Sequence, residues 1–310
     1  MSTGHADGLA KTFLPDVERI AEGFIRCFDL TFGQEEPVLA DPLCRWVDFV
    51  LRYVEPVPRR VEFSHEFWQG TPEDLTTAVE RFAHRGANGQ DINPHQGRGL
   101  TAHDVSTKRS AQRTDLLWAD WGIHHFHLTD SPIALGDKYS ERSDWLLFAK
   151  VLPDALLCID VRNHPKGSGF ASQDLVSIAV KSWPHVFEPY RAKGVTGGDW
   201  SADDVHGLRK RGANVLLKVG QRVYTPPGGG ITAASTPLRV HYQSDQIRIE
   251  VEALARWFAG GRDSAVRQCQ DAGIPHPEFH LDIAPGGRLA LCAKRPSGSL
   301  LAIIDVILEW

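Results

Sequence analysis

Histidines concentrate in one short segment of the chain, where His124, His125 and His127 lie among apolar and aromatic neighbours. Successive side chains of a β-strand point to opposite faces, so His125 and His127 would share one face while His124 points to the other. An imidazole, whose ordinary pKa is about 6.5, can accept or donate a proton near neutral pH, and when neutral it can bind a metal ion. The segment therefore predicts chemistry on one face of a β-sheet.

A second polar set lies about 35 residues further along, where Asp160, Arg162 and His164 alternate with apolar residues. We expect these three side chains to share one face and Ile159 and Val161 to lie opposite. If this strand neighbours the histidine strand, the two sets converge on one sheet surface. Arg142 and Lys166 would then lie at the rim of that surface.

Residues 84–113 form a long polar stretch punctuated by glycine and proline, a length that is uncommon in compact domains unless the loop is functional or mobile. The stretch is locally basic, and we expect it to bind substrate through Arg98, Lys108, Arg109 and Arg113. A solvated surface loop is the alternative interpretation of the same composition.

Metal-independent cleavage of an RNA phosphodiester would use this set of residues directly. A neutral histidine removes the 2′-hydroxyl proton, a second protonated group serves the leaving oxygen, and arginine or lysine stabilises the charge on the phosphate. The basic loop would hold the RNA backbone, because phosphate contacts require only positive donors. We therefore expect a nuclease-like enzyme with no cofactor.

Two alternatives use the same residues differently. His125 and His127, with Asp160 or His164 as a third ligand, could bind Zn²⁺ or Mn²⁺ in a metal-dependent hydrolase. In the other alternative the chain is a non-enzymatic interaction or regulatory module, and the histidines are half-buried aromatic side chains with hydrogen-bond partners. Whether the chain is an enzyme at all stays open at this level.

The elements that must position these residues indicate an α+β protein of two domains, residues 1–193 and 199–310, separated by a glycine-rich boundary. Apolar spacing predicts a helical N-terminal layer and an antiparallel sheet in the first domain, and a second α+β unit that recognises substrate or a protein partner. In the first domain the predicted elements are helices near 17–28, 43–54, 71–82 and 172–183 and strands at 121–128, 145–152 and 155–161, of which the last two form a hairpin with its turn at Pro153 and Asp154. In the second they are a helix that begins with a capping box of Ser201 and Asp204, strands near 215–219 and 222–224, helices at 246–258 and 264–272, and strands at 279–283, 288–294 and 300–308.

Composition limits the function classes further. The chain has 310 residues, 42% hydrophobic and 24% charged, with a formal net charge of −5, so no overall positive field draws it to nucleic acid or an anionic membrane. No apolar run reaches the roughly 18 residues that a membrane helix needs. The five cysteines are scattered and form no C-x-x-C pair. We expect a cytoplasmic protein with reduced thiols and no membrane contact.

The order of these motifs resembles the central sheet of RelE/HigB-like toxin ribonucleases. The resemblance covers about 45 of the 310 residues: GIHHFHL at 122–128, then Arg142, then WLLFAKV at 145–151 and LLCIDVRNHPK at 156–166. It implies a small sheet with helices packed on it, metal-independent mRNA cleavage, and a toxin or defence role. By position, it assigns the chemistry to His125, His127, Arg142, His164 and Lys166, although this chain has histidines where those toxins usually have arginines.

Overall fold

The computed structural model describes residues 3–32, 41–102, 115–129, 131–133, 136–164, 173–233, 236–284, 287–295 and 297–306. The chain divides into two compact units, Leu51–Arg239 and a discontinuous unit of Met1–Val50 with Val240–Trp310. This division differs from the expected one, since the glycine-rich boundary between 193 and 199 lies inside the first of these units.

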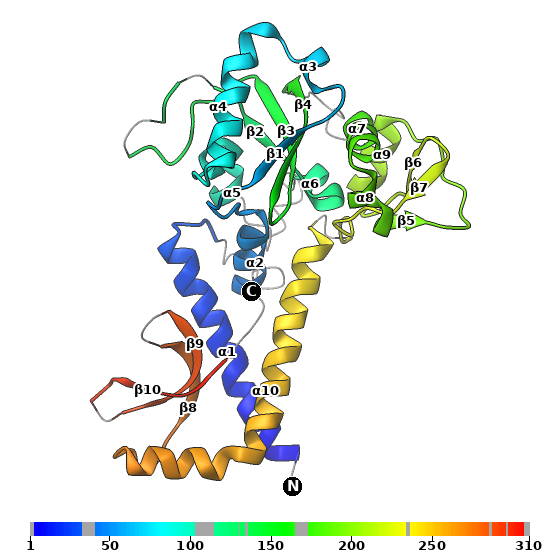
Figure 1. Ribbon diagram of the computed structural model, residues 1–310. Coiled ribbons are helices and arrows are strands. Elements are labelled where there is room, and N and C mark those ends of the chain that lie inside the picture. Colours follow the sequence, from blue (N-terminus) through cyan, green and yellow to red (C-terminus); the bar gives the residue numbers. More distant parts are fainter. Residues whose placement is uncertain are drawn as a thin grey trace. The chain divides into compact units, whose positions relative to one another are not determined.

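The Leu51–Arg239 unit is built on a four-stranded sheet with the strand order β1-β4-β3-β2 (Figure 1). The strands are β1 (Arg60–Phe63), β2 (Ile123–His127), β3 (Trp145–Val151) and β4 (Ala155–Asn163). β2, β3 and β4 are antiparallel as predicted, with β3 and β4 forming the expected hairpin, whereas β1 is an additional strand that pairs with β4 in parallel. The expected neighbour relation of β2 and β4 is wrong, because β3 lies between them.

A β-bulge in β4 changes which side chains share a face. Phe148 pairs with Asp160 and Ala149 pairs with Cys158, so Ile159 is the extra residue on β4. Ile159 consequently packs in the same cluster as Phe148, while Val161 packs on the opposite face. The prediction that Ile159 lies opposite Asp160 with Val161 is therefore wrong, because strict alternation stops at the bulge.

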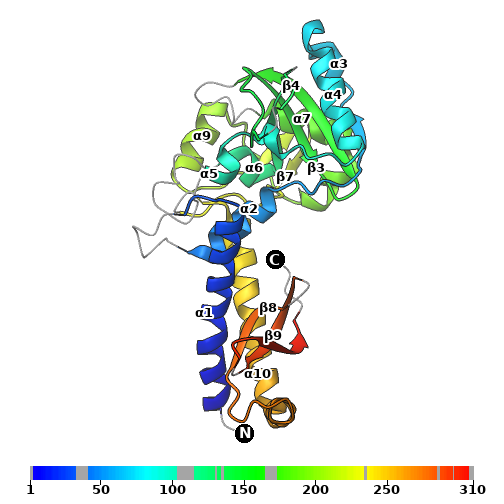
Figure 2. The same cartoon turned by 90° about the vertical axis from the view of Figure 1, so that its left-hand side faces the viewer.

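Helices cover both faces of this sheet (Figures 1 and 2). One face packs Phe126, Leu147 and Cys158 against α3 (Phe67–Gly70) and α4 (Thr76–Ala87). The other packs Ile123, Phe148 and Leu157 against α6 (Leu116–Trp121), α7 (Asp174–Ser182), α8 (Pro184–Phe187) and α9 (Ala202–Lys210). The face that carries His125 and His127 is thus mostly an apolar interior, and polar chemistry is confined to its edges.

The remaining elements of this unit are short. A three-stranded sheet, β5-β7-β6, consists of β5 (Arg191–Ala192), β6 (Leu217–Val219) and β7 (Arg222–Tyr224). The other segments are the 3₁₀ turns η1 (Glu73–Leu75), η2 (Asn93–Gln96) and η5 (Glu188–Tyr190) and the single turn α5 (Gly99–Ala102). The predicted capping box at the start of α9 is present, with Ser201 and Asp204 satisfying each other's backbone N–H groups.

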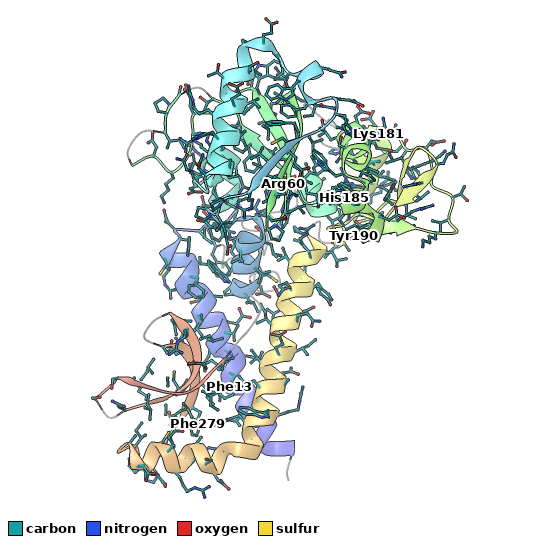
Figure 3. The ribbon with its side chains drawn as sticks, viewed as in Figure 1. Phe13, Arg60, Lys181, His185, Tyr190 and Phe279 are labelled. Atoms are coloured by element: carbon teal, nitrogen blue, oxygen red, sulfur yellow. The ribbon has the colours of Figure 1, made fainter. Side chains whose placement is uncertain are left out.

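The second unit contains three longer helices and a small sheet. They are α1 (Thr3–Cys27), α2 (Pro42–Arg52), α10 (Leu238–Asp271), β8 (Phe279–Ala284), β9 (Arg288–Lys294) and β10 (Leu300–Asp305), with strand order β10-β9-β8. Phe258 of α10 contacts Phe13 of α1 and Phe279 of β8, at ring-centroid distances of 6.4 and 4.9 Å. Figure 3 labels Phe13 and Phe279. These aromatic contacts join the helices and the sheet into one core.

α10 corrects one element prediction, since it is a single helix where the sequence predicts separate helices at 246–258 and 264–272. Gly260 and Gly261 lie between the two predicted helices, but glycine only lowers helix stability by about 1 kcal/mol, which packing can override. The α+β fold class is confirmed. Within the described residues, no helix combines the length and the apolar character that crossing a bilayer requires.

Candidate functional site

The sheet separates the residues that were expected to converge. In the strand register His125 lies beside Phe148, and Phe148 lies beside Asp160. His127 is likewise separated from Arg162 by Leu146. Two strand spacings amount to about 10 Å, so His125 and Asp160 do not form one contact group.

Asp160 and Arg162 bind each other rather than either histidine. The Arg162 Nε donates to Asp160 Oδ2 at 2.7 Å, and the other oxygen of Asp160 accepts from the Val161 N–H at 2.8 Å. Arg162 also lies 3.7 Å from Asp174 at the start of α7. This ion-pair group ties β4 to α7, which is a structural role.

His125 pairs with a carboxylate that was not predicted as a site residue. Asp115, the N-cap residue of α6, lies 3.0 Å from His125 Nδ1 and accepts a hydrogen bond from the Trp118 N–H. Burial alone would raise the pKa of Asp115, but the charge of His125, with the hydrogen bonds of His125 and Trp118, lowers it to about 2. Asp115 is therefore ionised, and it holds the His125 ring against the start of α6.

His124, on the opposite face, is a buried neutral histidine. Burial lowers its pKa to about 3, and its Nδ1 lies 3.4 Å from Gln96 Oε1. The Gln96 amide nitrogen in turn donates to Asn93 Oδ1 and to the Arg52 carbonyl. His124 thus helps to anchor the η2 segment to the sheet.

His127 combines a fixed orientation with a ring nitrogen that lies beside a glycine. Its Nδ1 lies 2.9 Å from the Ser143 carbonyl oxygen, and because a carbonyl only accepts, the proton of the neutral ring is on Nδ1. Burial lowers the pKa of His127, so the ring is neutral at pH 7. No hydrogen bond to Nε2 occurs in the described part of the chain. A Cβ added to Gly97 would lie 3.4 Å from Nε2, so the space beside this atom exists because residue 97 is glycine.

The backbone around His127 is held by another buried histidine. His95 of η2 directs its Nδ1 to the His127 carbonyl oxygen at 3.0 Å and lies edge-on to Phe82. Burial lowers the pKa of His95 as well, which keeps it neutral and donating. The η2 segment therefore fixes both the end of β2 and the position of Gly97.

A pocket of about 490 Å³ opens beside His127. It is lined by Gly97, Arg98, His127, Ser131, Pro132, Ile133, Asp137, Lys138, Tyr139, Ser140, Glu141 and Arg142. Three cationic side chains and two acidic ones stand around this cavity. Arg98, His127 and Arg142, which the sequence predicts as site residues, thus line one cavity. Lys138, Tyr139 and Gly97 line it as well and were not predicted.

Two contacts hold the loop that carries Arg142 against the segment that carries Arg98. The Ser140 N–H donates to the Pro94 carbonyl at 3.0 Å. The hydroxyls of Tyr139 and Thr101 are hydrogen-bonded to each other. The pocket is therefore formed by two segments that are bonded to each other rather than by independent loops.

His164 lies beside the His127 ring. The two ring centroids are 6.4 Å apart, and the ring planes differ by 24°. His164 is exposed at the end of β4 and does not line the pocket among the residues described. Lys108, Arg109, Arg113 and Lys166 fall outside the described residues.

A half-buried lysine occurs on the apolar face of the sheet. Lys150 Nζ donates to the Trp121 carbonyl at 3.0 Å and lies 5.7 Å from the centre of the Phe187 ring. Burial, with a smaller contribution from Arg239, lowers the pKa of Lys150 to about 8. The sequence offers no warning of this, because lysine at a strand end is normally exposed.

The metal alternative lacks a ligand group in the described residues, since no three His, Cys, Asp or Glu side chains are placed to share an ion. His125 Nδ1 is directed at Asp115, and Asp160 is engaged by Arg162.

The chain was compared with protein-family models, curated proteins and solved structures, and none of them matches it. The resemblance to RelE/HigB-like toxins therefore stays an expectation from the sequence.

Proposed function

We propose that this protein cleaves RNA without a metal ion, in the pocket beside His127. The observation that carries the proposal is the state of this ring. Its Nδ1 proton is donated to the Ser143 carbonyl, and the unprotonated Nε2 lies beside Gly97, which lines the pocket together with His127. A neutral imidazole held in one orientation is the group that proton abstraction from a 2′-hydroxyl needs.

The phosphate would lie among the cationic side chains of the pocket. Arg98, Lys138 and Arg142 come from two segments that flank His127, and guanidinium groups bind phosphate oxygens through paired N–H donors. Asp137 and Glu141 line the same space, which leaves a formal excess of one positive charge in the lining. That balance suits one phosphodiester rather than a highly charged polyphosphate.

The reaction would proceed by internal transesterification. His127 Nε2 takes the proton of the 2′-hydroxyl, and the 2′-oxygen forms a bond to phosphorus while the bond to the 5′-oxygen breaks. The leaving 5′-oxygen receives a proton from a protonated group, for which exposed His164, beside the His127 ring, is the candidate. The products are a 2′,3′-cyclic phosphate and a 5′-hydroxyl end.

The sharpest test uses His127→Asn on the full chain. The asparagine Nδ2 can still donate to the Ser143 carbonyl, as His127 Nδ1 does at 2.9 Å, but it provides no base. With single-stranded RNA in EDTA, we expect the wild type to give cyclic-phosphate ends and the variant to be slower by about 10²–10⁴-fold. A strand with 2′-deoxy sugars should not be cut.

Arginine variants test phosphate binding separately. Arg142→Ala should slow cleavage on the order of 10²-fold and make the rate less dependent on salt. The matched control is Arg211→Ala. Arg211 is an exposed arginine that is remote in sequence from the pocket segments and absent from the pocket lining, so this variant should cut RNA at the wild-type rate. Cleavage that survives His127→Asn, or that stops in EDTA, refutes the proposal.

A further inference from the structure

The most exposed large apolar side chains of the described residues lie on one helix. Tyr242, Ile249 and Trp257 of α10 are 65%, 53% and 62% exposed, more than any other large apolar residue in that part of the chain. Single exposed apolar residues are common, but a row of them is not.

These residues form one stripe along α10. The spacing of 242, 249, 253 and 257, in which position 253 is an exposed alanine, keeps all four on one face of a 3.6-residue helix over about 22 Å. The opposite face carries Val240, Ile247, Val251 and Phe258, which are buried in the core of their own unit. α10 is therefore apolar on two opposite faces, and its own unit covers only one of them.

Charges beside the stripe differ between its two ends. Asp245 lies along one flank near the N-terminal end, and Arg256 lies along the same flank near the C-terminal end. Among the described residues each forms an ion pair within its own helix, Asp245 with Arg248 at 3.3 Å and Arg256 with Glu252 at 3.7 Å. In a symmetric antiparallel helix pair the same flanks meet, so each Asp245 would lie beside an Arg256.

We propose that this stripe binds a second copy of the chain through an antiparallel α10 pair. A twofold axis between positions 249 and 250 places Tyr242 against the partner's Trp257 and Ile249 against its own copy. It also places Asp245 beside the partner's Arg256. In a symmetric parallel pair the opposite flanks would meet instead, which brings Asp245 against the flank that carries the partner's Glu250, and like charges at contact are destabilising. The alternation of acid and base on one flank thus selects the antiparallel arrangement and identifies the chain itself as the complementary surface.

Sedimentation of the full chain tests the association. The protein concentration should span roughly 1–100 µM, which covers weak to moderate dissociation constants. We expect a dimer that dissociates on dilution and that Ile249→Glu shifts to monomer by at least about tenfold in Kd. Val195→Glu, an equally drastic change at a 48% exposed valine of the other unit, should leave the dimer unchanged.

Charge exchange tests the orientation. Asp245→Arg and Arg256→Asp should each weaken the dimer, and the double variant should recover it, with thermal unfolding confirming that every variant is folded. In a Cys27→Ser background, Tyr242→Cys mixed with Trp257→Cys should cross-link, whereas Tyr242→Cys alone should not. A monomer at every concentration, a dimer that Ile249→Glu does not affect, or no recovery in the double variant would each overturn the proposal.

Discussion

Acidification should destabilise this protein through His124, whose ring is buried between Trp118 and Phe126. Its pKa is about 3 in the folded chain and about 6.5 in an unfolded one. Between these values the unfolded state binds a proton that the folded state excludes, so stability falls as the pH falls. Above pH 6.5 both states are neutral and the effect vanishes.

The size of the effect follows from the difference in proton binding. A pH of 4.5 lies about two units below the pKa of an unfolded imidazole, and each unit corresponds to about 1.36 kcal/mol. His124 alone should therefore lower the free energy of unfolding by about 2.5 kcal/mol between pH 7 and pH 4.5. The pKa values of His95 and His127 are also lowered by burial, so their contributions have the same sign.

Urea unfolding of the wild type and of His124→Leu at a series of pH values isolates the contribution of His124 to the pH dependence of stability. Leucine removes the titrating group while keeping an apolar side chain of similar size. The difference in unfolding free energy between the two proteins should change by about 2.5 kcal/mol in favour of the variant from pH 7 to pH 4.5. Parallel stability curves over this range would show that the ring is not buried as a neutral group.

Three further perturbations have defined outcomes. Lys150→Met should be more stable than the wild type at pH 7 in chemical-denaturation curves. The difference in unfolding free energy should disappear as the pH rises from about 8 to 10.5, because in this range Lys150 is protonated only in the unfolded wild type. Ser201→Ala should cost about 1 kcal/mol of unfolding free energy by removing the hydrogen bond to the Asp204 N–H. Gly97→Ala should cost about 1–3 kcal/mol at a backbone with φ +77 and ψ −179. Its methyl group would also lie 3.4 Å from His127 Nε2, so RNA cleavage should fall by more than the folded fraction does.

Alternation and turn chemistry predicted much of the sheet from the sequence. The hairpin at Pro153 and Asp154, the antiparallel strands and the capped helix at Ser201 follow from local patterns, and all are present. The parallel strand β1 was missed, because four residues with no strict alternation give little signal. The unit boundary was also missed, since α10 returns to the N-terminal helices and sequence order cannot show such a return.

The candidate site was only partly accessible from the sequence. Alternation placed His125 and His127 on one face, but strand order decides which neighbours they meet, and β3 separates them from Asp160. Arg98 and Arg142 line the His127 pocket because the 131–142 segment is bonded to η2, a long-range contact that no local pattern encodes. Gly97 could have been noticed as a glycine within the basic stretch, although its role depends on its distance from His127.

Measuring the protonation state of the His127 ring tests its proposed role as the base most directly. Long-range ¹H–¹⁵N correlation spectra of the full chain should show a neutral His127 at pH 7 with the proton on Nδ1. Its titration midpoint should lie below the ordinary value, and its Nε2 resonance should shift when a non-cleavable 2′-deoxy dinucleotide is added. A proton on Nε2, a charged ring at pH 7, or a resonance that the dinucleotide does not move would contradict the proposed base and the site built around it.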